Sequence, residues 1–72
     1  MEAEKWGRRI RAYRKLKGYT QESFSNELGV SVSIVGEIER GSRMATNEIL
    51  DKICKALKVS LEELTPPKNG DI

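Results

Sequence analysis

The sequence contains no histidine and a single cysteine, Cys54, among its 72 residues. Without histidine, the chain lacks the commonest general base and the commonest metal ligand of proteins. One cysteine can supply neither a structural zinc site nor an internal disulfide. We therefore expect no enzyme, no bound metal and no other cofactor. A lone thiol is also typical of a reducing setting, which favours a cytoplasmic location.

Long apolar runs are missing as well. No stretch approaches the roughly 20 apolar residues of a membrane-spanning helix. The first residues, MEAEKWGRR, have no apolar segment behind their charges, so we expect no secretory signal. Strand-like alternation and glycine-rich phosphate loops are also absent. A chain of this length is expected to form one small domain, which leaves no second domain to sense a small-molecule ligand.

Charge is distributed unevenly along the chain, although the net charge is only +2. Residues 5–20 contain bases and no acid, whereas residues 21–39 contain acids and no base. Such a basic segment is either a solvated helix face or a surface that contacts phosphates. The bases are Lys5, Arg8, Arg9, Arg11, Arg14, Lys15 and Lys17, and the acids are Glu22, Glu27, Glu37 and Glu39.

The stretch from residue 20 to residue 41 predicts two short helices joined by a tight turn. Thr20 and Ser31 are suited to cap the two helices, because their hydroxyls can accept from free backbone amides. Gly29 follows the first helix where a left-handed residue is favoured. Two helices joined by so short a turn must cross steeply. This is the helix-turn-helix arrangement, whose second helix enters the DNA major groove.

Three further helices are predicted around this pair. Their apolar residues recur at helical spacing, and each inward stripe is expected in the core. Ser60 and Glu63 form a predicted capping box for the last helix, which Pro66 and Pro67 prevent from extending. The helices are expected at about 3–16, with Trp6, Ile10 and Tyr13 inward, at 46–57, with Ile49, Leu50, Ile53 and Leu57 inward, and at 60–64.

Four segments of the chain follow one another in a single register: Gly18-Tyr19-Thr20-Gln21, Leu28-Gly29-Val30-Ser31, Ile38-Glu39-Arg40-Gly41 and Ala56-Leu57-Lys58-Val59-Ser60-Leu61-Glu62-Glu63-Leu64. In order and spacing they resemble the Cro/repressor-type (XRE-like) helix-turn-helix family of small bacterial and phage DNA-binding regulators. The resemblance implies a compact all-α domain of five helices over residues 9–64, with the motif at 20–39 and a polar tail at 65–72. It also implies a sequence-specific regulator that binds double-stranded DNA as a homodimer.

The resemblance also assigns roles to individual residues. An arginine of the first helix, Arg14, is expected to pair with Glu39 late in the third. Phosphate contacts are expected from Gln21, Arg40, Ser42 and Arg43. Base contacts fall on the outward positions of the third helix, Val32, Ser33, Gly36 and Glu37.

These outward residues depart from the family, in which amides or basic residues are common at such positions. Val32 can press on a thymine methyl group, and Glu37 can accept from a cytosine amino group. Gly36 has no side chain, so its backbone either comes close to the DNA or leaves a gap there. The helix has no arginine to recognise guanine. The alternative function is therefore a protein–protein interaction module with secondary DNA binding. Its support is this acidic segment and three apolar residues expected to be exposed, Leu16, Val32 and Met44.

Overall fold

The computed structural model describes residues 2–67 and confirms the predicted all-α architecture of five helices. Within that range no strand occurs, and none of the helices is both long and apolar enough to cross a bilayer. Residues 68–72 of the predicted polar tail lie outside the described part. The helices are α1 (Glu2–Leu16), α2 (Gln21–Leu28), α3 (Val32–Arg40), α4 (Asn47–Leu57) and α5 (Leu61–Leu64).

Hydroxyl side chains cap the starts of α2 to α5, as the sequence predicts. Each accepts from the backbone amide three residues later, which satisfies one of the free amides of the first turn. Ser60 and Glu63 form the expected capping box on α5. Lys58 ends α4 in the left-handed region with φ 58°, where glycine is favoured. The capping residues are Thr20, Ser31, Thr46 and Ser60.

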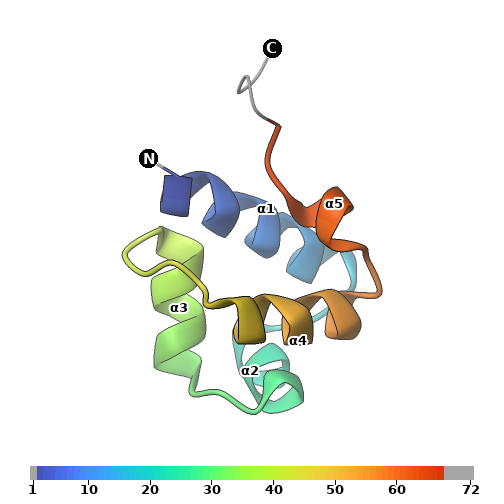
Figure 1. Ribbon diagram of the computed structural model, residues 1–72. Helices are drawn as coiled ribbons and strands as arrows, with labels where there is room; N and C mark the ends of the chain where they lie inside the picture. The colour runs from blue at the N-terminus through green and yellow to red at the C-terminus, as the bar shows by residue number, and fades with distance from the viewer. Residues whose placement is uncertain (1, 68–72) are drawn as a thin grey trace.

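The helices surround a single core, with α1 crossing the C-terminal end of α3 and α4 lying in front of α2 (Figure 1). Helix α5 packs against both α1 and α4. Helix α3 packs against both α1 and α2 and lies at one edge of the domain (Figure 1). The buried apolar residues are Ile10, Phe24, Leu28, Val35, Ile38, Ala45, Leu50, Ile53, Leu57 and Leu64.

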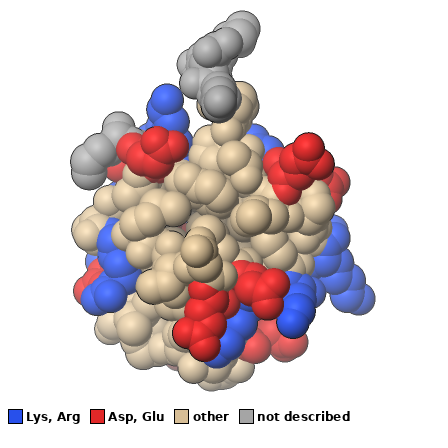
Figure 2. All heavy atoms as spheres, viewed as in Figure 1, with Lys and Arg blue, Asp and Glu red and all other residues tan. Residues whose placement is uncertain are grey.

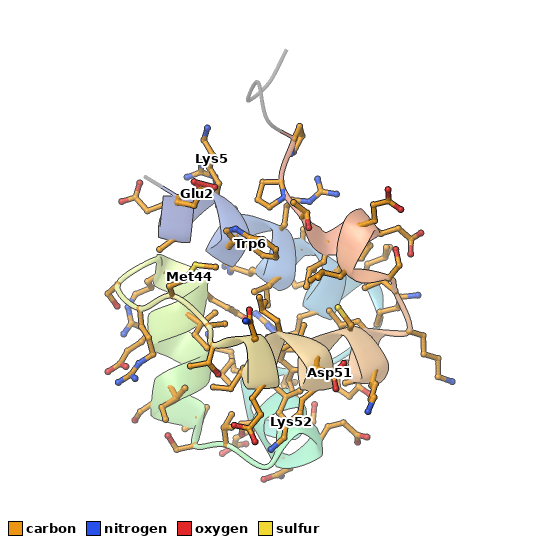
Figure 3. The ribbon with its side chains drawn as sticks, in the orientation of Figure 1. Glu2, Lys5, Trp6, Met44, Asp51 and Lys52 are labelled. Carbon is orange, nitrogen blue, oxygen red and sulfur yellow. The ribbon has the colours of Figure 1, made fainter. Side chains whose placement is uncertain are left out.

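The core differs in detail from the sequence prediction. Trp6, Tyr13 and Ile49 were expected inside but are only half-buried at its edge. Trp6 packs against this core from α1 (Figure 3). Ala45, in the connection between α3 and α4, is also buried and anchors that connection to the core.

Cys54 is half-buried beside the apolar stripe of α4. Burial raises the pKa of its thiol above the ordinary value, and the negative charge of Asp51 raises it further. Since the thiolate is the reactive form of cysteine, a raised pKa makes this thiol a poor nucleophile. The environment of Cys54 therefore fits a packing residue better than a reactive one.

Candidate nucleic-acid interface

A tight turn holds α2 and α3 at a steep angle. Gly29 ends α2 with φ 73°, and its amide donates to the carbonyls of Ser25 and Asn26. Ser31 caps α3 only two residues later. The positive φ is the reason glycine is needed here. The turn leaves the N-terminal half of α3 projecting from the body of the domain (Figure 1).

A buried ion pair fixes α1 against the end of α3. Arg14 donates from Nε to Glu39 Oε2 over 2.6 Å and from Nη2 to Glu39 Oε1 over 3.2 Å. The two side chains are only 8% and 1% exposed. Nη1 of Arg14 also donates to the carbonyl of Tyr19 over 2.8 Å, just ahead of α2. A single guanidinium thus connects three elements of the domain.

Gln21, the first residue of α2, joins the same network. Its side-chain amide donates to Glu39 Oε1 over 3.0 Å. The sequence predicts that Gln21 contacts a phosphate, and the structure shows part of its amide already bound within the protein. The remaining amide proton and the free backbone amides of the first turn stay available to an anion. The predicted phosphate contact therefore stays a prediction.

The outward side of α3 carries three of the four predicted base contacts, whereas the fourth, Gly36, is buried. Val32 is 42% exposed, and Ser33 is exposed beside it at the start of the helix. One turn later, Glu37 is partly exposed and turns toward the α3–α4 loop. There its Oε1 accepts from Nε of Arg43 over 2.6 Å. A predicted base contact and a predicted phosphate contact are thus paired with each other.

The end of α3 is closed by Gly41 and Ser42. Gly41 has φ 83°, and the amide of Ser42 donates to the carbonyl of Glu37 over 3.0 Å. The hydroxyl of Ser42 donates to the same carbonyl over 3.2 Å. Ser42 thus caps the helix with both of its donors, and its phosphate contact stays a prediction. Arg40 lies on the outward side, with its guanidinium over Gly36.

The basic segment of α1 is not one uniform surface. Arg14 is buried, and Arg9 donates to the carbonyls of Glu63 and Leu64 at the end of α5. Acidic and basic side chains are interleaved on the face that Figure 2 shows. The exposed bases that can face phosphates are Arg8, Arg11, Lys15 and Lys17.

Two structural residues of this interface escape the sequence prediction. Gly7 is buried where α1 crosses α3, and a Cβ atom there would lie 2.4 Å from the carbonyl oxygen of Ile38. Its only signal in the sequence is a glycine inside a helical pattern, which usually has a packing reason. Tyr19 packs its ring 5.3 Å from that of Phe24 and accepts from Arg14 through its carbonyl.

Comparison with known proteins places this geometry among DNA-binding regulators. The chain matches the family model described as helix-turn-helix over residues 10–64. It is 60% identical over 68 residues to the HTH-type transcriptional regulator YazB of Bacillus subtilis (strain 168), covering 94% of this chain and 99% of YazB.

Two solved structures have the same fold. One is the restriction-modification controller protein C.AhdI from Aeromonas hydrophila, with a TM-score of 0.82 and 35% identity over 86% of this chain and 94% of that one. The other is SinR, the master regulator for biofilm formation, in complex with DNA. Its TM-score is 0.77, with 35% identity over 82% of this chain and 95% of that one. The chain spans 58% of the length of full SinR from Bacillus subtilis.

Proposed function

Because the chain belongs to the helix-turn-helix family of DNA-binding transcriptional regulators, we propose that it recognises a specific double-stranded DNA site and does so as a homodimer. One observation carries the proposal: Val32 and Ser33 on the outward side of α3 are exposed, while its inward side is held by α1 and the buried pair of Arg14 and Glu39. A recognition helix needs this combination of exposure and fixed angle. Such a regulator works where the DNA is, so we also propose a cytoplasmic location.

Phosphate contacts are proposed on both sides of α3. Gln21 and the first amides of α2 precede α3 in the chain, and Arg43 lies in the loop that follows it. Amides at a helix start favour an anion, because they are unpaired and carry the positive end of the helix dipole. Contacts to the backbone on both sides would set the depth of α3 in the groove without selecting a sequence.

The homodimer follows from the small number of base contacts that one copy can make. Val32 and Ser33 are exposed at the start of α3, and Glu37 is partly exposed one turn later. Two copies related by a two-fold axis double these contacts on a symmetric site. Half-sites are then expected about 34–36 Å apart, one helical turn of DNA or a multiple of it.

Salt dependence tests the proposal of DNA binding. We expect the logarithm of the affinity to fall with the logarithm of the salt concentration, with a slope of about −3 to −6 per dimer, because phosphate contacts release counterions. Titration of fluorescent genomic fragments at several salt concentrations measures the slope and the number of chains per site. No retardation at low salt would contradict DNA binding, and a single chain per site would contradict the dimer.

The substitution Glu37→Gln tests whether this residue contacts a base. If Glu37 accepts from cytosine, glutamine should shift the preference at one base pair of each half-site toward adenine by about 1–3 kcal/mol. Affinity for non-specific DNA should also rise, because a negative charge is lost and Arg43 is released. Binding-site selection with both proteins measures the first effect, and titration of random duplex measures the second.

The matched control is Glu27→Gln, which removes the same charge from an exposed position on α2. It should leave the selected sequence unchanged. If Glu37→Gln selects the same sequence as the wild type, Glu37 is not a base contact. The exposed apolar side chain of Val32 on α3 would then favour the alternative function, a surface for another protein.

A further inference from the structure

Arg40 is the last residue of α3, and its side chain folds back along the helix. A Cβ atom at Gly36 would lie 3.0 Å from Nη1 and 3.8 Å from Cζ of Arg40. The three atoms nearest to that position, apart from the helix backbone, all belong to this guanidinium. Residues four apart share a helix face, and helical side chains lean toward the N-terminus. The charge of Arg40 therefore lies beside the middle of α3 and not beyond its end.

Because Gly36 has no side chain, it leaves room for the guanidinium of Arg40 beside the middle of α3. Glycine inside a helix costs about 1 kcal/mol relative to alanine, so it calls for a local reason. Gly36 does not have a positive φ, and no neighbouring helix comes within 4 Å of where its Cβ would be. The space is taken by the guanidinium alone. Any side chain at this position would push Arg40 outward.

The donors of Arg40 are not used within the described residues. The nearby carboxylate of Glu37 is bound to Arg43, over 2.6 Å, and no hydrogen bond or ion pair engages Arg40. Arg40 is also exposed, so its guanidinium faces solvent on the outward side of α3. Arginine recognises guanine by donating two parallel hydrogen bonds, to O6 and N7, at the edge of the major groove.

We propose that Arg40 recognises a guanine in each half-site and that Gly36 positions it to do so. The inference rests on the proposed DNA binding and goes beyond it, because it names the base and the residue. It replaces two expectations from the sequence, that Arg40 contacts a phosphate and that α3 has no arginine for guanine. Base recognition by α3 then depends on Arg40, the last residue of the helix, whose side chain extends back over Gly36.

Binding-site selection from random duplexes tests the proposal with the wild type, Arg40→Gln and Gly36→Ala. The wild type should select one guanine in each half-site. Arg40→Gln should lose that preference by roughly 5- to 150-fold and shift it toward adenine, the base that glutamine pairs with. Gly36→Ala should weaken the same guanine preference, because the new methyl group displaces the guanidinium, and it should leave the fold intact by circular dichroism.

The matched control is Arg43→Gln, which removes the same charge from the loop. It should lower the affinity for all sequences alike and keep the guanine. The proposal is overturned if Arg40→Gln behaves in that way, since Arg40 would then be a phosphate contact. It is also overturned if the wild type selects no guanine, and unchanged selection by Gly36→Ala would overturn the role of Gly36. A wild type that retards no duplex would refute the proposed function itself, which is a distinct result.

Discussion

The substitution Gly7→Ala should destabilise the domain by about 3 kcal/mol, because overpacking against backbone lies at the upper end of the usual range. The added Cβ would lie 2.4 Å from the carbonyl oxygen of Ile38 and 2.6 Å from that of Glu39. Both oxygens belong to the backbone of α3, so no side chain can rotate away. The two helices would have to separate, which would also loosen the buried pair of Arg14 and Glu39.

Thermal unfolding followed by circular dichroism measures this effect. For a domain of this size, about 3 kcal/mol corresponds to a fall in melting temperature of roughly 12–24 °C. Gly36→Ala is the matched control, because it adds the same methyl group inside a helix where only the flexible end of Arg40 is near. The control should gain up to about 1 kcal/mol from helix propensity. Equal melting temperatures for Gly7→Ala and the wild type would show that α1 and α3 can separate at little cost.

Local features of the fold were predictable because they depend on neighbouring residues. A hydroxyl such as Thr20 or Ser31 satisfies a free amide three residues later, whatever surrounds the helix. Gly29 and Gly41 adopt a positive φ that few other residues tolerate. Phe24, Leu28, Val35 and Ile38 recur at helical spacing, and all four are buried in the core. Such signals fix the helices and the turn of the motif.

Features that depend on distant parts of the chain were not predictable in this way. Gly7 meets α3 only because the helices cross there, and no local pattern shows the crossing point. Arg9 belongs to the basic segment that the sequence leaves as either a solvated helix face or a phosphate-contacting surface, but it binds the end of α5, more than 50 residues away. The sequence shows that Gly36 and Arg40 are four residues apart, but it does not show that the guanidinium of Arg40 points back toward Gly36. The roles of the predicted DNA contacts depend on a partner molecule and stay predictions.

The substitution Arg14→Ala should also destabilise the domain, by about 3 kcal/mol or more, because it leaves the carboxylate of Glu39 buried without its charged partner. The side chain of Glu39 is 1% exposed and would keep only the amide of Gln21 as a donor. The carbonyl of Tyr19 would lose its bond to Arg14 as well. A loss of this size is a large part of the roughly 4–11 kcal/mol expected for a domain of this length.

A double-mutant cycle of Arg14→Met and Glu39→Met separates the buried charge from lost packing. Each single substitution leaves one buried charge unpaired, whereas the double substitution leaves none, so its loss of stability should be smaller than the sum of the two. Urea unfolding measures all four proteins. The double variant should also bind DNA more weakly if the pair sets the angle of α3. Additive losses would mean that the two charges do not interact, and unchanged stability of Arg14→Ala would mean that the pair is exposed in solution.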